Sequence, residues 1–269
     1  MADIIPIDSK RSPLHQRSVS LQLIGEIAEK TGMMPFIGTA SDGHDYWCKR
    51  VNSNHDREAV VNEVAASVIG HRIKANVREW KIVTVPDWMT GHPVGAGQYR
   101  YRLDGRPLFG SLDLHTGVLK RPENVIPHVT EDSNDRHVPK LLALWMMCNV
   151  EEDIQVLADE ATDNTLWSID HGFWFDSWGP PWGFSELDTL AGKPRLPRLR
   201  EEISQQHWEH AIDSLDALDS SLAEEIFSQI PAEWQVKESE IEKLSRYVLS
   251  RVDYTKSELR RMQENQPRR

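Results

Sequence analysis

Residues 36–49 read Phe-Ile-Gly-Thr-Ala-Ser-Asp-Gly-His-Asp-Tyr-Trp-Cys-Lys and contain the strongest short-range structure signal in the chain. The Asp42-Gly43 pair separates two short runs with β-branched and aromatic residues, which is the pattern of two antiparallel strands joined by a tight turn. The sequence therefore predicts a β-hairpin, and the second strand of this hairpin closes with Lys49.

A helical pattern follows the hairpin after a polar loop, beginning near residue 57 and ending near Gly70. Either Asn54 or Asp56 is the expected cap of this helix. Its apolar residues recur at helical spacing, at Ala59, Val60, Val64 and Val68.

Glu63 lies at the border of the apolar face of this predicted helix, where its carboxylate can turn inward toward Lys49. Such a carboxylate holds an ammonium group in place against phosphate oxygens, to which the lysine presents a point charge. Considered singly, both residues also fit ordinary surface positions.

The remaining elements divide the chain into two parts. We expect strands at 80–85, within 99–111 around an Asp104-Gly105 turn, at 154–158 and at 166–169, and helices at 21–27, at 140–147 and over most of the chain after Leu199, with a break at Pro231. The sequence thus predicts an α+β fold with a strand-rich lobe over residues 1–111 and a mainly helical lobe over residues 112–269.

Composition and charge narrow the function classes. The chain has 269 residues, of which 39% are apolar and 27% charged, as in ordinary globular proteins. Residues 1–111 carry a net charge of +2 and residues 112–269 a net charge of −13. An acidic second half repels phosphate backbones, so we expect no nucleic-acid partner.

Membrane insertion and disulfide bonding are also disfavoured by the sequence. No run of apolar residues is long enough to span a bilayer, and the first ten residues lack a secretory signal pattern. Cys48 and Cys148 are the two cysteines, too few for a disulfide framework. We therefore expect reduced thiols, a cytoplasmic location and no membrane partner.

A second candidate for chemistry lies far along the chain, at the end of the predicted strand 166–169. Asp170 follows this strand directly, and Gly172 comes two residues later. A carboxylate at a strand end is a common position for holding Mg²⁺ bound to phosphate, because Mg²⁺ takes only one or two protein carboxylates beside water and phosphate oxygens. An Asp-x-Gly sequence is also common in ordinary turns.

The turn of the first hairpin, Ser41, Asp42 and Gly43, is a third candidate. Its backbone amides could cover phosphate groups. A hairpin turn with one glycine is, however, usually no more than a turn.

Several short stretches carry a resemblance to a known family: Gly32–Gly43, Tyr46–Lys49, Val61–Ala65, Phe109–Ser111, Leu144-Trp145, Ser168–Gly172, Ile230–Trp234 and Ser250-Arg251. Over about residues 30–255 the chain resembles the HipA-like kinase family, within the broad superfamily of protein and lipid kinases. Asn62-Glu63 and Ile169–Gly172 are the more specific parts of this resemblance.

The resemblance implies a bilobal, protein-kinase-like fold that binds ATP and Mg²⁺. It further implies that Lys49 contacts the nucleotide phosphates, that Glu63 positions Lys49 and that Asp170 binds the metal. The phosphates would also meet Ser41, Asp42 and Gly43.

One stretch departs from the family pattern, in the loop before the strand 154–158. Kinases of this kind place a catalytic aspartate five residues before a metal-binding asparagine. Aligning Leu157 with the family's strand puts Gln155 at the asparagine position and Val150 at the aspartate position. Gln155 keeps an amide oxygen on a longer side chain and is a second candidate metal ligand. Val150 cannot accept a proton.

Three acidic residues next to Val150 could replace the missing base: Glu151, Glu152 and Asp153. A solvated acidic loop also explains them, and we favour this explanation. Three functions therefore stay open. The first is an ATP- and Mg²⁺-dependent HipA-like phosphotransferase with a degenerate catalytic loop, acting on a protein hydroxyl group. The second is a kinase-like protein that binds nucleotide or a partner without phosphoryl transfer, and the third is a fold that serves only as an interaction scaffold.

Overall fold

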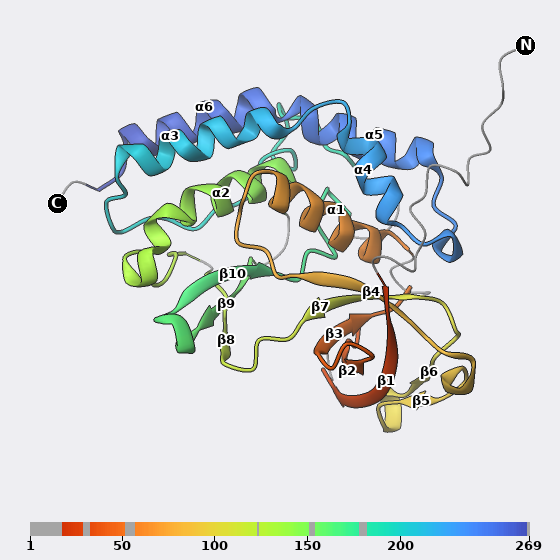
Figure 1. The fold of residues 1–269 in the computed structure, drawn as a ribbon. Coiled ribbons are helices and arrows are strands. Elements are labelled where there is room, and N and C mark those ends of the chain that lie inside the picture. The colour runs from red at the N-terminus through yellow and green to blue at the C-terminus, as the bar shows by residue number, and fades with distance from the viewer. Residues whose placement is uncertain are drawn as a thin grey trace, which may run out of the picture.

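Figure 1 shows a barrel of strands on one side of the molecule and a stack of helices on the other. The computed structural model describes residues 18–28, 33–51, 57–122, 124–150, 154–177 and 182–267. The expected helix caps Asn54 and Asp56 lie outside the described residues, and so do Glu151, Glu152 and Asp153.

Five strands close into the barrel in the order β1-β2-β3-β7-β4. Their bounds are β1 Ser18–Ile27, β2 Phe36–Ala40, β3 Asp45–Lys49, β4 Trp80–Thr84 and β7 Leu108–Leu112. The predicted hairpin is confirmed, because β2 and β3 pair antiparallel around the turn at Gly43, whose φ of 82° suits glycine. The predicted strands at 80–85 and within 99–111 are confirmed as β4 and as β6 (Tyr101–Arg102) with β7, and β5 (Pro93–Val94) pairs with β6.

The segment 21–27 is a strand and not a helix, so that prediction is wrong. It belongs to β1, which pairs antiparallel with β2 and parallel with β4. Leu21 is fully buried inside the barrel, whereas Leu23 is mostly exposed. A short apolar run carries no reliable period, and the backbone hydrogen bonds offered by two neighbouring strands decide its conformation here.

The predicted helix after the hairpin is confirmed as α1 (Glu58–Arg72), and it is buried on all sides from Glu58 to Gly70. It shares one apolar core with α2 and the later helices, while the inside of the barrel forms a separate core. Arginines hold both of its ends to the helical part. Arg57 pairs with Glu240 at 2.6 Å, and Arg72 pairs with Glu225 at 2.5 Å. α1 is thus fixed mechanically to the second half of the chain.

The second half consists of a three-stranded antiparallel sheet in the order β10-β9-β8 and a layer of helices. The bounds are β8 Gly117–Lys120, β9 Gln155–Asp159, β10 Thr165–Ile169, α2 Val138–Met147, α3 Gln205–Ser214, α4 Leu222–Gln229, α5 Glu238–Ser250 and α6 Val252–Glu264. In Figure 1, α1 and α2 lie between the strands and the outer helices α3 and α6.

The predicted α+β fold with a strand-rich first part and a mainly helical second part is confirmed. Strands β9 and β10, helix α2 and the helical region after Leu199 lie where the sequence predicts them, and Pro231 separates α4 from α5. Strand β8 was not anticipated. In the part of the chain that the structure describes, no helix combines the length and apolar character needed to cross a bilayer.

Gly70 permits a close approach between the end of α1 and the segment that follows it. A Cβ atom at this position would lie 2.6 Å from Cγ1 of Val77. We expect Gly70→Ala to lower the free energy of unfolding by about 1–3 kcal/mol through overpacking, although alanine is the better helix former by about 0.5–1 kcal/mol.

Urea unfolding of Gly70→Ala, Val77→Ala and the double variant measures this effect. Because Val77→Ala removes the clashing methyl groups, the double variant should lose less free energy of unfolding than the two single variants lose together. Strict additivity would contradict the steric explanation.

Candidate functional site

A cleft of about 700 Å³ lies between the barrel and the three-stranded sheet. Its barrel side includes Trp47, Lys49, Phe109 and Ser111, and its sheet side includes Leu119, Arg121, Gln155, Leu157, Ile169 and Asp170. Residues 112–115, which lead from β7 to β8, also line the cleft, and there His115 pairs with Asp113 at 2.7 Å. The charged side chains of Lys49, Glu63 and Asp170 gather at the other end, the charged end of the cleft.

Three residues from distant parts of the chain meet at the charged end. Lys49 ends β3, Glu63 lies in the middle of α1, and Asp170 follows β10. The Lys49 ammonium group contacts Oε1 of Glu63 and lies 2.5 Å from Oδ1 of Asp170. Lys49 is 7% exposed and Glu63 2% exposed, so both charges are almost completely removed from solvent.

Burial and pairing act in opposite directions on these two groups. Burial alone would lower the pKa of Lys49, but the negative charges of Asp170 and Glu63 raise it above its usual value. Burial alone would raise the pKa of Glu63, but the charge of Lys49 and hydrogen bonding with His171 lower it to about 2. Both groups are accordingly charged at neutral pH, and the positive charge of Lys49 suits it to holding phosphate oxygens.

Gln155 lies next to Asp170 at the same end of the cleft. Its Nε2 donates a hydrogen bond of 2.5 Å to Oδ2 of Asp170. The backbone of Asp170 has a φ of 59°, in the left-handed region, and its side chain is about one third exposed to the cleft. Asp170 and Gln155 both line the cleft, and a carboxylate with an amide is a donor set that suits Mg²⁺, since this ion takes its remaining ligands from phosphate and water. Within the described ranges, no group of three or more His, Cys, Asp and Glu residues could hold a metal without such help.

The structure does not bring Ser41, Asp42 and Gly43 to the cleft. Their turn lies at the far end of the hairpin, where Ser41 Oγ accepts a hydrogen bond from the backbone of Ser20 and Asp42 accepts one from Tyr46. The amides of Ser41 and Gly43 donate to backbone carbonyls of the barrel. A phosphate-covering role for this turn stays a prediction.

Val150 lies in the hydrophobic core, with 2% of its surface exposed. Its backbone amide donates to the carbonyl of Trp145 at the end of α2. An aliphatic side chain in this position neither reaches the cleft nor accepts a proton.

Asn62 is a residue for which sequence reasoning predicted no role. It is fully buried, and its Nδ2 lies within hydrogen-bond distance of the carbonyls of Gly172 and Trp174 and of Ser177 Oγ. Its Oδ1 accepts a hydrogen bond from Trp182. The segment after Asp170 is thereby tied to α1, one residue before Glu63.

His171 connects the same two elements. Its backbone amide donates a 3.0 Å hydrogen bond to Oε1 of Glu63. Glu63 is therefore held by Lys49 from the barrel and by His171 from the segment after β10. No local pattern in the sequence indicates either this bond or those of Asn62, because the partners are more than 100 residues apart.

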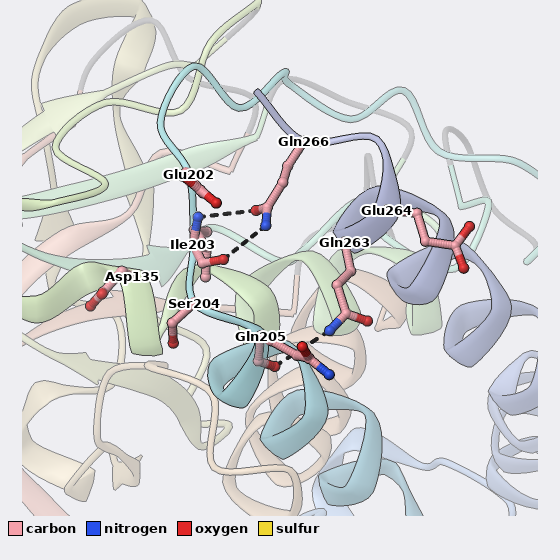
Figure 2. A pocket seen from close by; sticks show the side chains of 8 residues that line it. All are labelled: Asp135, Glu202, Ile203, Ser204, Gln205, Gln263, Glu264 and Gln266. Carbon is pink, nitrogen blue, oxygen red and sulfur yellow. Dashed lines mark hydrogen bonds between the residues drawn. The ribbon is translucent and has the colours of Figure 1, made fainter. Parts of the chain in front are cut away.

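A second cavity of about 720 Å³ lies between the start of α3 and the end of α6 (Figure 2). Figure 2 shows Gln266 exchanging two hydrogen bonds with the backbone of Ile203, which ties the end of the chain to α3. Among the residues that the structure describes, its lining includes Asp135, Glu202 and Glu264 and no lysine or arginine. The negative charge of these carboxylates repels phosphate groups, so the cleft between the barrel and the three-stranded sheet is the better candidate for a nucleotide site.

Comparisons with known proteins give few matches. No family model and no curated protein matches the chain. Among solved structures, the Golgi casein kinase with Mn/ADP bound is 10% identical with a TM-score of 0.48, over 90% of this chain and 74% of that one. The Helicobacter pylori proinflammatory kinase CtkA is 10% identical with a TM-score of 0.49, over 92% of this chain and 97% of that one.

A further structure of the Golgi casein kinase is 11% identical with a TM-score of 0.46, over 92% of this chain and 74% of that one. At this similarity the comparisons assign neither activity nor substrate. The fold is α+β, with a barrel of strands in the first part of the chain and a mainly helical second part. A strand lysine paired with the glutamate of the next helix, facing a strand-end aspartate, is the arrangement of protein kinases.

We expect Asn62→Ala to loosen the segment after Asp170. The substitution removes the hydrogen-bond partner of the Gly172 carbonyl and of the Trp182 indole, at a cost of about 1–3 kcal/mol for each unsatisfied group. Hydrogen exchange should become faster at the amides of residues 172–177. Asn76→Ala is the matched control, because the side chain of Asn76 donates to the carbonyl of Leu166 instead. Unchanged exchange over 172–177 in Asn62→Ala would contradict the role of Asn62.

Proposed function

We propose that this protein is an ATP- and Mg²⁺-dependent phosphotransferase of the HipA-like class that acts on a hydroxyl group of a protein. The observation that carries the proposal is the meeting of Lys49, Glu63 and Asp170 at one end of a single cleft. In a protein kinase the equivalent lysine–glutamate pair and metal-binding aspartate must both be in place for transfer.

The cleft offers a separate environment for each part of the nucleotide. Leu119 and Leu157, which face each other on β8 and β9, line the sheet side of the cleft and would pack against the base. The phosphates would then extend toward Lys49. In this proposal the lobe of residues 1–111 contributes the barrel wall and the lobe of residues 112–269 the sheet wall.

Asp170 and Gln155 are the residues that would hold Mg²⁺. When bound, the ion neutralises charge that develops on the phosphate oxygens. Asp170 uses one oxygen for Lys49 and the other for Gln155, so its carboxylate is already oriented toward the charged end of the cleft.

The transfer itself needs little covalent chemistry from the protein. The acceptor hydroxyl oxygen forms a bond to the terminal phosphorus, the bond to the bridging oxygen breaks, ADP leaves, and the hydroxyl proton passes to a base or to water. Glu63 and Asp170 are both engaged by Lys49 and are poor candidates for that base.

A second function is favoured by one specific observation, the burial of Val150. With a valine in the core at the position aligned with the catalytic aspartate, the protein would bind nucleotide without transferring phosphate efficiently. A positioned base contributes roughly 10²–10⁴-fold to rate. The two functions thus share nucleotide binding and differ in turnover.

We expect wild-type protein to bind ATP and Lys49→Met to bind it more weakly, by about 1.5–3 kcal/mol or roughly 10- to 150-fold, because a charge-assisted contact to phosphate is lost. Isothermal titration calorimetry with and without Mg²⁺ measures the affinity. Lys81→Met is the matched control, since Lys81 is a barrel lysine on β4 outside the cleft lining. Thermal unfolding of each variant verifies its fold, and equal ATP affinity in Lys49→Met and wild type would refute the assignment of Lys49.

We expect phosphate transfer from labelled ATP to a protein acceptor to be slow, and the Mg²⁺-dependent part to disappear in Asp170→Asn. The reason is that the amide keeps the shape of the side chain but loses the charge that attracts the ion. Glu151→Gln, Glu152→Gln and Asp153→Asn, measured at saturating ATP, identify a replacement base. ATP binding with no transfer under any condition would favour the nucleotide-binding function over the phosphotransferase.

A further inference from the structure

Strand β8 presents alternate residues to the nucleotide cleft. Gly117, Leu119 and Arg121 line the cleft, whereas Val118 and Lys120 do not. This alternation is that of a β-strand, in which successive side chains point to opposite faces. Arg121 directly follows the last residue of β8 and continues its cleft-facing side.

The strand register locates Arg121 at the charged end of the cleft. Lys120 pairs with Val156, so the next residue along the antiparallel ladder, Arg121, stands opposite Gln155. Gln155 in turn pairs with Ile169, the residue before Asp170. Directly opposite residues have Cβ atoms about 4.5–5.5 Å apart. Arg121, Gln155 and the end of β10 therefore form one row across the floor of the cleft.

Arg121 differs from the other charged groups of this row in having no partner. It is exposed and makes no hydrogen bond or ion pair with the part of the chain that the structure describes. Lys49, by contrast, is held by Glu63 and Asp170. These three paired residues leave the site one negative charge in excess, and among the described residues lining the cleft Arg121 is the one Lys or Arg besides Lys49.

We propose that Arg121 binds the terminal phosphate group of the nucleotide. This inference rests on the proposed function and adds a residue that the resemblance does not supply. A guanidinium group binds two phosphate oxygens at once through a planar pair of N–H donors. Strand β8 runs away from the connecting segment at about 3.4 Å per residue, so Arg121 lies roughly 14 Å along the strand from Gly117, at the end of the cleft opposite the base.

Calorimetric titration of ATP and ADP into wild type, Arg121→Gln, Arg121→Lys and Lys120→Gln tests this role. Arg121→Gln should weaken ATP binding about 10-fold or more and leave ADP binding within about 2-fold of wild type, because ADP lacks the terminal phosphate. Arg121→Lys should recover part of the loss, since it keeps the charge without the planar pair of donors. Lys120→Gln removes the same charge from the other face of the strand and should change neither affinity.

The outcomes separate this inference from the proposed function. Wild-type protein that binds no ATP overturns both. ATP binding that is equally strong in wild type and Arg121→Gln overturns the role of Arg121 alone, and so does an equal loss of ATP and ADP affinity. If Lys120→Gln lost as much ATP affinity as Arg121→Gln, the loss would come from general surface charge. That result would also overturn the role of Arg121. Arg121 is exposed, so unchanged thermal unfolding is the expected control for each variant at this position.

Discussion

The ammonium group of Lys49 is buried where the barrel, α1 and the end of β10 meet. An unpaired charge in such a position would be strongly unfavourable, and removing one partner of a buried pair typically costs about 3–5 kcal/mol. The carboxylates of Glu63 and Asp170 are therefore conditions for the fold as well as candidates for chemistry. The three residues come from three different parts of the chain, the end of β3, the middle of α1 and the residue after β10.

The attachment of α1 to the later helices determines where Glu63 lies. Because Arg57 and Arg72 fasten the two ends of α1 to later helices, Glu63 has a fixed place relative to the sheet of the second half. Asn62 and His171 fix the segment after Asp170 to the same helix. The barrel has its own separate core, so Lys49 is one of the contacts that determine how the barrel sits on this assembly.

The sequence predicts those elements whose conformation depends on residues close by in the chain. The Asp42-Gly43 turn, the apolar spacing around Glu63 and the strand that ends before Asp170 are each specified within a few residues, and the structure has all three elements. Strand β1 was missed because its conformation depends on pairing with β2 and β4, and β8 because four residues carry too little pattern.

The side chains that the sequence did not reveal act over long sequence separations. Asn62 bonds to carbonyls more than 100 residues away, and the place of Arg121 follows only from the register of β8 against β9. The residues next to Asn62 and Arg121 in the chain do not indicate either role, because each role depends on neighbours in space that are far away in the sequence. The chemistry expected at Lys49 and Asp170 could be inferred from residue type and order, whereas the supporting contacts required the fold.

The burial of Val150 changes which residues limit a phosphoryl transfer in this cleft. Such a transfer depends mostly on positioning and on neutralising charge, so loss of a base lowers the rate without removing the conditions for reaction. Under the proposed function those conditions would rest on Lys49, Asp170, Gln155 and Arg121, which line one cleft, and Lys49 and Gln155 already contact Asp170. Residues 112–269 carry a net charge of −13 with Arg121 included, and Lys49 and Arg121 place positive charge locally, in the cleft where a triphosphate would bind. Nucleotide binding is accordingly the property that this arrangement of charges would support most directly, and the rate of any transfer would depend on the group that accepts the hydroxyl proton.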